Sequence, residues 1–332
     1  MKKQHYIPLV SVISPTLNSE KDLPKLIESI KKQEYPSGKI EIIISDGGSI
    51  DNTIKIAKQN HTKIIKNKYV FAEPGIYLGM QKAKGELLMV LAPDNIYEDK
   101  YAFKKIAEIF SNNEIYAAFP KHDSLPSDTL FTRYMNTFTD PINHFVYSAA
   151  ANARTFKKMY KTIYTHETYD VYDFNSSKIH PILALAQGFT VRRNFRTIRK
   201  NIYDDITPIR DIFINHKIAY VHSLSLYHHT IRSMDHYLRK QRWLTRIALE
   251  DKRFGITARS KYFTTFQWFK FYLFPLYAFS IVFPMIRSII GYLQDRELIW
   301  FFEPIIAFLT ASTVSYELLR MRLGIGKIPS RL

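Results

Sequence analysis

The N-terminal part of the chain alternates between apolar runs of strand length and amphipathic runs of helical length, and this alternation limits the fold more than any other feature. The strand-like runs cover 7–15, 39–48, 62–67 and 87–92, and the helix-like runs cover 18–33, 49–60 and 75–85. Repeated β-α units predict an α/β protein with a mostly parallel, doubly wound sheet. Because the crossovers in such sheets are right-handed, the carboxyl ends of the strands meet at one edge, where ligands bind.

Composition limits the class of protein and its partners. A chain of 332 residues that is 46% hydrophobic can form a large folded domain with an appendage, and disorder is excluded. The lack of cysteine excludes disulfides and thiolate metal sites. The net charge of +17 fits nucleic acid, an anionic membrane surface or phosphorylated ligands. The sequence has no zinc finger or RNP motif, so we expect no nucleic-acid partner.

Two apolar stretches near the C-terminus, 271–293 and 298–319, are each as long as the ~20 residues that cross a bilayer. Basic residues flank them on both outer sides, and the connecting "QDRE" is nearly neutral. By the positive-inside rule, the stretches predict a transmembrane helical hairpin whose two ends lie in the cytoplasm. Pro275, Pro284 and Pro304 keep a re-entrant or monotopic arrangement open as the alternative.

Each apolar stretch carries an internal charge, Arg287 in the first and Glu303 in the second. The two residues lie at similar distances in sequence from the connecting loop, so a hairpin would place them at the same depth. Pairing would lower the cost of burying either charge in an apolar environment. We therefore expect an ion pair between these two side chains.

Asp46 ends the second strand-like run and is followed by Gly47 and Gly48. Glycines allow the backbone to come close to a flat ligand, and a carboxylate at this place can accept a hydrogen bond from the N–H of a base. The alternative is an ordinary turn residue in an Asp-Gly turn.

Two further acidic motifs lie where predicted elements begin or end. Asp94 and Asn95 follow 87–92 and offer hard oxygen ligands for Mg²⁺ or Mn²⁺, which would bridge a diphosphate. Asp204 and Asp205 precede a helix-like run and would supply a general base if the fold brings them opposite the first motif. Taken singly, each acid could equally be a helix cap or a turn residue.

Taken in order, these motifs resemble those of the family 2 glycosyltransferases of GT-A fold. The matching stretches are "PTLNSEKDLPKLIESIKKQEYP", "EIIISDGGSIDNT", "EPGIYLGMQKAKGELLMVLAPDN", "AQGFTVRRNF" and "YDDITPIRDIFINHKIAYVHSLSLYHH". They lie within roughly residues 8–230. The resemblance implies a Rossmann-like, mostly parallel sheet with flanking helices and a C-terminal hydrophobic helical membrane segment. Among the membrane-associated members of the family, the chain most resembles those that act on polyprenyl- or lipid-linked saccharides.

The resemblance also implies roles for individual residues. The implied nucleotide-sugar-binding residues are Pro15, Thr16, Asn18, Glu20, Asp46, Gly47, Asp94, Gln187, Arg242 and Trp243. Asp46 would read the base, and Gln187 with Gly188 resembles the acceptor-side segment. Asp205, the second member of an acidic pair with Asp204, would be the catalytic base.

A divalent cation, Mg²⁺ or Mn²⁺, would by the same resemblance be held by Asp94, Asn95 and His229. The family motif usually carries two acids, so a carboxylate and an amide would leave more of the coordination to the diphosphate. His228 and His229 end a predicted strand where a family histidine can face the metal. For either histidine, a structural role is the alternative.

The stretch "LRKQRWLTR" is similar to the Gln-x-x-Arg-Trp motif of membrane-bound family members, with Arg239 in the place of the glutamine. There the arginine and tryptophan, here Arg242 and Trp243, lie at the boundary between donor and acceptor. The alternative is a basic amphipathic helix that rests on anionic lipid.

These expectations divide the chain into four parts. They are a GT-A catalytic domain (1–230), amphipathic basic and aromatic interfacial helices (231–270), a two-helix membrane segment (271–322) and a basic tail (323–332). Within the first part, 121–180 interrupts the alternation and is expected to be an irregular and helical, acceptor-facing insertion.

The resemblance implies an inverting, metal-dependent hexosyltransferase at the cytoplasmic face of a membrane. It would move a sugar from a UDP- or GDP-sugar to a lipid-linked or glycan acceptor, with membrane lipids as further partners. The alternative is a non-catalytic subunit of a membrane glycan assembly complex that binds a sugar nucleotide or a lipid.

Overall fold

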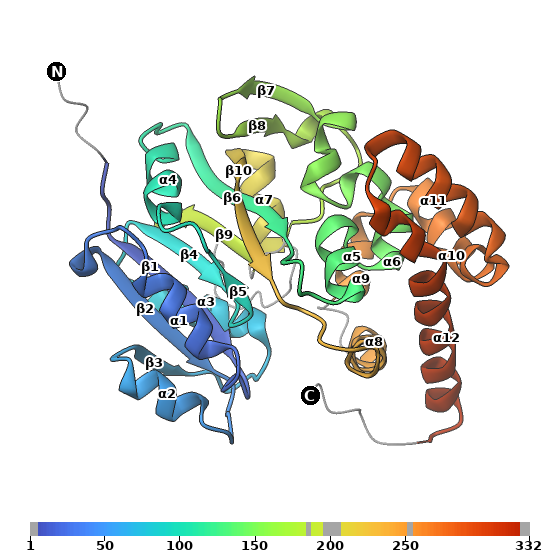
Figure 1. Cartoon of the computed structure of the whole chain (residues 1–332), viewed down its shortest axis with the longest axis horizontal. Helices are drawn as coiled ribbons and strands as arrows, with labels where there is room; N and C mark the ends of the chain where they lie inside the picture. Colours follow the sequence, from blue (N-terminus) through green and yellow to red (C-terminus); the bar gives the residue numbers. More distant parts are fainter. Residues whose placement is uncertain (1–5, 184–186, 195–206, 251–254, 326–332) are drawn as a thin grey trace. The chain divides into compact units, whose positions relative to one another are not determined.

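The computed structural model describes residues 6–183, 187–194, 207–250 and 255–325. Contacts divide the chain into two compact units, coloured along the sequence in Figure 1. The sheet unit comprises 1–122, 160–176 and 183–228, and the helical unit comprises 123–159, 177–182 and 229–332. This division differs from the ranges expected from the sequence, because 123–159 groups with the C-terminal helices and not with the sheet.

The described part of the sheet unit is built on a ten-stranded sheet of order β3-β2-β1-β4-β9-β6-β10-β8-β7, with β5 paired to β10. The strands are β1 Val10–Thr16, β2 Ile40–Asp46, β3 Lys63–Lys66, β4 Leu87–Leu91, β5 Asn95–Ile96, β6 Ile115–Asp123, β7 Lys161–Thr165, β8 Asp170–Asp173, β9 Gln187–Arg192 and β10 Lys217–His228. Parallel pairing joins β3, β2, β1 and β4. Beyond β4, β9 pairs antiparallel with β4 and β6, and β10 pairs antiparallel with β5 and β8. The predicted α/β sheet is confirmed, with its parallel part in the N-terminal strands.

Helices flank the parallel strands as the alternation predicts. The helices of the sheet unit are α1 Leu23–Lys31, α2 Thr53–Gln59, α3 Ala72–Lys82, α4 Ala102–Ile109 and α7 Thr207–Asn215, with the 3-10 helices η1 Ser37–Lys39 and η4 Phe174–Ser176. In α1, Leu23, Leu26, Ile27 and Ile30 are each no more than 2% exposed. This helical stripe joins inward-facing side chains of β1, β2 and β4 in one core.

The helical unit contains 123–159, the larger part of the segment 121–180 that was expected to be an irregular and helical insertion, whereas 160–176 belongs to the sheet unit and forms β7 and β8. The helices of the helical unit are α5 Leu130–Phe138, α6 Pro141–Tyr147, α8 Met234–Glu250, α9 Gly255–Arg259, α10 Thr265–Ser280, α11 Val282–Asp295 and α12 Glu303–Arg322, with the 3-10 helices η2 Ser148–Ala150, η3 Ala153–Lys158, η5 Ser260–Tyr262 and η6 Leu298–Phe302. Side-chain caps start α5 and α6: Thr129 accepts from the Thr132 N–H and Asp140 from the Asn143 N–H. α6 packs against α10 and α12, and α8 packs along α12.

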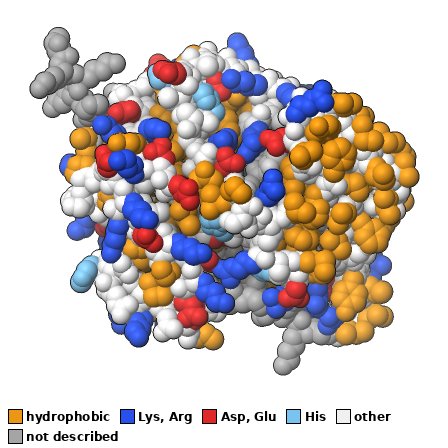
Figure 2. All heavy atoms as spheres, viewed as in Figure 1, with side chains coloured by type: hydrophobic (Ala, Val, Ile, Leu, Met, Phe, Trp, Pro, Cys, Tyr) orange, Lys and Arg blue, Asp and Glu red, His pale blue; other side chains and the backbone are white. Residues whose placement is uncertain are grey.

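The first predicted membrane span is divided between two helices. α10 ends at Ser280, α11 begins at Val282, and the two helices are bent by 97°. Among the described residues, one continuous helical segment is long and apolar enough to cross a membrane by itself. It is Leu298–Arg322, which consists of η6 and α12. Apolar side chains gather on the surface over α10, α11 and α12 (Figure 2). The bend fits the re-entrant alternative, and the membrane topology stays a prediction.

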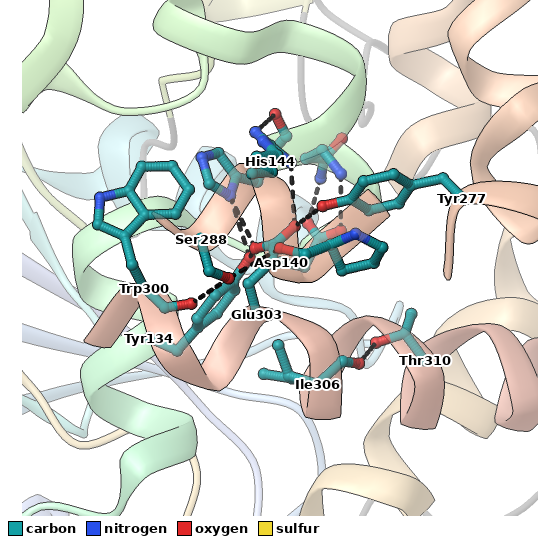
Figure 3. A network of polar contacts seen from close by, with 12 residues as sticks. Tyr134, Asp140, His144, Tyr277, Ser288, Trp300, Glu303, Ile306 and Thr310 are labelled. Atoms are coloured by element: carbon teal, nitrogen blue, oxygen red, sulfur yellow. Dashed lines mark hydrogen bonds and ion pairs between the residues drawn. The ribbon is translucent and has the colours of Figure 1, made fainter. Parts of the chain in front are cut away.

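Glu303 is fully buried at the start of α12 and contacts four side chains (Figure 3). Arg287 Nη1 lies 3.0 Å from Glu303 Oε1, and the Tyr277 hydroxyl donates to the same oxygen at 2.8 Å. The Tyr134 hydroxyl donates to Oε2, and His144 Nδ1 lies 3.2 Å from it. Burial and the nearby Arg287 lower the pKa of His144 to about 4, so Arg287 supplies the positive charge at neutral pH. The predicted pairing of Arg287 with Glu303 is confirmed.

Removal of Arg287 should leave the Glu303 carboxylate buried without a counter-charge. We expect Arg287→Met to lower the free energy of unfolding by about 3–5 kcal/mol. The double variant with Glu303→Gln should recover much of this loss because no charge is left buried. Unfolding in detergent can be followed by tryptophan fluorescence, since Trp243, Trp268 and Trp300 all lie in the helical unit. Equal losses in the single and double variants would contradict the assignment.

Candidate functional site

The carboxylate of Asp46, at the end of β2, is buried and accepts four hydrogen bonds from the protein. Oδ2 accepts from the backbone N–H groups of Gly48 and Ser49, each at 2.9 Å. Oδ1 accepts from the hydroxyl groups of Thr16 at 3.2 Å and Ser49 at 2.5 Å. Asp46 therefore fixes its own turn and ties that turn to the end of β1. Its contact with a base stays a prediction, and a base would share oxygens that the turn already uses.

A second set of hydrogen bonds joins the loop after β1 to the loop after β2. Asn18 donates its backbone N–H to Ser49 Oγ and accepts from the Ile50 N–H through Oδ1, each at 2.9 Å. Glu20 Oε2 accepts from the backbone and side-chain amides of Asn52 at 3.1 and 3.0 Å. Asn18 and Glu20, predicted to line a nucleotide, thus hold these two loops together at the carboxyl edge of the sheet.

Gly47 lies where three backbone segments meet. Its N–H donates to the Thr16 carbonyl at 2.8 Å, and a Cβ at this position would lie 2.8 Å from the Val70 carbonyl oxygen. Pro15, the other predicted residue of this region, lies in β1 opposite Ser45 of β2. Crowding within the protein therefore requires the glycine, whether or not a ligand also approaches it.

Asn95 closes the turn at the end of β4. Its Oδ1 accepts from the Ala92 N–H and its backbone N–H donates to the Ala92 carbonyl, both at 3.0 Å. The side chain is fully buried, and Nδ2 has no hydrogen-bond partner among the described residues. The oxygen predicted to bind a metal is therefore engaged in the turn, and the metal-ligand role of Asn95 stays a prediction.

Asp94 stands on the exposed side of the same turn, where its side chain is 25% exposed. Its Oδ2 lies 3.5 Å from His228 Nε2, at the end of β10. The His228 ring lies 6.3 Å from the ring of His122, and His122 Nε2 is 3.1 Å from the Gln187 carbonyl oxygen. Strands β4, β10, β6 and β9 thus bring together one acid and two histidines. The sequence analysis did not single out His122, because the chain beyond 121 reads as irregular.

The parallel register of the strands places Asp94 at the same edge of the sheet as the loops that follow β1 and β2. Thr16 is level with Asp46, and Ile13 is level with Val90. Thr16 and Asp94 follow Ile13 and Val90 by three and four residues, so both belong to the same carboxyl edge. The structure therefore brings Thr16, Asp46 and Asp94 to one edge of the sheet, as the alternation predicts.

Arg192 and Arg193, which follow Gly188, stabilise the fold through hydrogen bonds to backbone carbonyl groups. Arg192 donates from Nε to the Ile115 carbonyl at 2.9 Å and from Nη2 to two carbonyls just after α4. Arg193 donates to the Lys84 carbonyl at 2.9 Å. These bonds anchor β9 against its neighbours.

Three predicted residues lie in the helical unit. His229 Nδ1 lies 2.6 Å from Asp128 Oδ1, whereas its neighbour His228 is the histidine beside Asp94. Arg242 Nε donates to Glu317 Oε2 at 2.7 Å, and Trp243 follows it on α8. The roles of His229, Arg242 and Trp243 stay predictions. Asp204 and Asp205 lie outside the described residues, in the chain between β9 and α7.

The donor groups at Asp94 fit part of a divalent-metal site. Within the described ranges, no cluster of three or more His, Asp or Glu side chains is close enough to hold a metal alone. Mg²⁺ is commonly held by one or two carboxylates together with substrate phosphates. The Asp94 carboxylate, with the His228 ring beside it, fits a cation whose other ligands come from a bound diphosphate.

A cavity of about 260 Å³ lies within the helical unit and has a different lining. It includes Arg287, Lys158, Asn152, Asp295 and Trp300. Asp295 accepts from the Trp300 indole N–H at 2.7 Å, and Arg287 is engaged with Glu303. Arg287 and Asp295 thus already have partners within the protein.

The strand order and the polar carboxyl edge define the class of protein: an α/β protein of GT-A fold. The sequence model of the family described as Glycosyl transferase family 2 matches residues 11–179, just over half of the chain. The chain belongs to this family.

Curated relatives match part of the chain. The glycosyltransferase AglE of Haloferax volcanii is 30% identical over 94 residues, which are 26% of this chain and 31% of that protein. The dolichyl N-acetyl-α-D-glucosaminyl phosphate 3-β-D-2,3-diacetamido-2,3-dideoxy-β-D-glucuronosyltransferase of Methanococcus voltae is 32% identical over 93 residues, 24% of this chain and 27% of that protein. The matched region spans less than a third of either relative.

A solved structure shares the fold over most of the chain. It is a mannosyltransferase from Pyrobaculum calidifontis in complex with GDP-Man and Mn²⁺, with a TM-score of 0.52 and 11% identity. The match covers 95% of this chain and 87% of that chain. At this identity the likeness shows the fold alone.

Gly188, next to the predicted Gln187 in β9, provides a test of the site's packing. Its φ is +76°, and a Cβ would lie 2.7 Å from Leu226 Cδ2 and 2.9 Å from Pro120 Cγ. We expect Gly188→Ala to lower the free energy of unfolding of the sheet unit by about 2–4 kcal/mol. Gly38→Ala is the control, since a Cβ there meets nothing within 4 Å. Circular dichroism in denaturant measures both, and equal stabilities would show that the backbone at Gly188 does not require a glycine.

Proposed function

We propose that the protein is an inverting glycosyltransferase that moves a sugar from a UDP- or GDP-sugar to a lipid-linked acceptor at the cytoplasmic membrane face. The observation that carries this proposal is the convergence of Thr16, Asp46 and Asp94 at one edge of adjacent parallel strands. Membership of the family supports the reaction class. A nucleotide sugar with a divalent cation is present in the solved mannosyltransferase that shares the fold.

The strand order suggests how the donor lies. Asp46 ends β2, Thr16 ends β1 and Asp94 follows β4, in the sheet order β2-β1-β4. A nucleotide placed with its base toward Asp46 would put its diphosphate near Asp94 and its sugar toward His228. A bound Mg²⁺ or Mn²⁺ at Asp94 would neutralise charge on the departing diphosphate. The surplus of positive charge on the chain would favour the approach of this anionic donor.

In the proposed reaction, Asp205 takes the proton from an acceptor hydroxyl as that oxygen attacks the anomeric carbon. The bond from this carbon to the diphosphate oxygen breaks, and the diphosphate leaves with the electron pair. Attack opposite the leaving group inverts the configuration at the anomeric carbon. Asp204, its neighbour in the acidic pair, completes the acceptor side of the site in this proposal.

A lipid-linked acceptor is supported by the helical unit. Its surface carries many exposed apolar side chains on α10, α11 and α12, a feature that marks contact with membrane or protein partners. The name of the relative from Methanococcus voltae specifies a dolichyl phosphate-linked sugar as its substrate. A catalytic unit tied to a membrane is suited to an acceptor that cannot leave the membrane.

Replacement of the proposed base should abolish transfer without loss of donor binding. We expect Asp205→Asn to lower kcat by at least about 100-fold. Asp211→Asn, on α7 a few residues further on, is the matched control and should stay within about two-fold. The assay screens radiolabelled sugar nucleotides against a total lipid extract and counts label in the organic phase. Turnover of Asp205→Asn close to wild type would remove Asp205 from the mechanism.

Replacement of the proposed metal ligand should change the metal requirement. We expect Asp94→Asn to raise the Mn²⁺ concentration for half-maximal transfer by at least about 10-fold, because an amide is a weaker ligand than a carboxylate. The Mn²⁺-dependent rise in melting temperature with UDP or GDP should shrink in parallel. Glu98→Gln, an exposed acid nearby, is the control. An unchanged metal titration would exclude Asp94 as the ligand.

The second candidate function is a non-catalytic subunit that binds a sugar nucleotide. It is favoured by Asn95, whose oxygen is engaged in a turn where the family usually has a second acid. This function predicts stabilisation by UDP or GDP that does not depend on Mn²⁺, together with no transfer from any donor. Transfer of sugar into the lipid phase would exclude it.

A further inference from the structure

We propose that the helical unit enters only one leaflet of the membrane, through the elbow formed by α10 and α11, and does not cross it. The occupant of this apolar surface is the acyl-chain region of the cytoplasmic leaflet. The inference deepens the proposed membrane association and rests on it. It replaces the transmembrane hairpin that the apolar stretches predict with a monotopic attachment.

The two helices of the elbow are each too short to cross a bilayer. α10 has 16 residues and α11 has 14. At about 1.5 Å per residue they are roughly 24 and 21 Å long, against a hydrocarbon core of about 30 Å. The bend of 97° between them prevents their lengths from adding along one direction. An elbow of this shape can lie within one leaflet but does not reach the other side.

The elbow presents apolar side chains to the outside along both arms. The most exposed are Phe266, Phe269, Tyr272, Leu276, Val282 and Phe283, each 60–71% exposed. Figure 2 shows apolar side chains gathered over these helices. Aromatic side chains are common on α10, as in segments that lie at the membrane interface. Such a surface is suited to lipid on its outer side and to protein on its inner side.

Together with η6, α12 forms the helix Leu298–Arg322 that is long enough to cross a bilayer, but α12 packs on the charged helix α8. Near its C-terminal end, the buried Glu317 accepts from Arg242 at 2.7 Å and is paired with Arg246, both on α8. The outer side of α8 carries an exposed ion pair between Arg239 and Asp235. A bilayer around α12 would immerse these charges of α8 in hydrocarbon, which costs several kcal/mol per charge at the bilayer centre. α12 is therefore placed alongside the membrane with α8, outside its core.

The turn between α11 and η6 distinguishes the two topologies. In a transmembrane hairpin, Glu297 in this turn lies on the outer face of the membrane, opposite the sheet unit. In a monotopic attachment, it lies on the same face as the sheet unit. Because the chain has no cysteine, each position can be labelled as a single thiol without removing native ones.

The test compares Glu297→Cys with Ser37→Cys, an exposed position of the sheet unit, in right-side-out and inside-out membrane vesicles. We expect a membrane-impermeant maleimide to label both thiols from the cytoplasmic face only. Labelling of Glu297→Cys from the opposite face would establish the hairpin and overturn the proposal. Labelling from neither face before detergent is added would place the turn inside the bilayer and would also overturn it.

A second measurement tests the elbow itself. A fluorophore on Phe283→Cys should be quenched at least about three-fold more than one on Ser37→Cys by spin-labelled lipids in phosphatidylglycerol vesicles. Absence of this difference, with sugar transfer retained, would overturn the membrane surface and leave the enzymatic proposal standing. Strong quenching without transfer from any donor would instead overturn the enzymatic proposal alone.

Discussion

The parallel pairing of β1 with β2 and β4 is the constraint on which the candidate site depends. Parallel strands point the same way, so the residues that follow them meet at one edge although they are distant in sequence. Thr16, Asp46 and Asp94 are brought together by this pairing alone. The antiparallel strands β9 and β10 then add Gln187 and His228 at the same edge, next to Asp94 rather than Asp46. In the proposed function, the nucleotide lies at the Asp46 end of this edge and the sugar at the Asp94 end.

The loops at this edge are held before any ligand arrives. Asp46 and Asn18 use most of their hydrogen-bonding groups to fix the loops after β1 and β2 to each other. A ligand that binds here meets a shape already formed, so little conformational entropy is lost on binding. The predicted nucleotide-binding residues therefore have a structural role that a sequence pattern does not distinguish from a binding role. Both roles require the same residue types at the same strand ends.

Local periodicity and counting along the chain were enough for the α/β alternation and the pairing of Arg287 with Glu303. Both predictions concern residues that are close in sequence, within one strand or helix or across one short connection between two helices. The grouping of 123–159 with the C-terminal helices depends on contacts between distant segments, which no local pattern encodes. The break at Ile281 was equally hidden, because its φ of 57° is rare for a β-branched residue and no glycine marks it. His122 was missed because β6 continues to it past the point where the apolar pattern stops.

The burial of Asn95 explains why an amide follows Asp94. Its side chain is fully enclosed, and its oxygen already accepts the Ala92 N–H that closes the turn. An aspartate there would place an ionised group in the same enclosed space, one residue from the Asp94 carboxylate. Burying a charge without a paired partner costs far more than burying an amide. The departure from the two-acid pattern of the family thus follows from the packing of this turn. In the proposed function, Asp94 is then the carboxylate at the end of β4 that meets the cation.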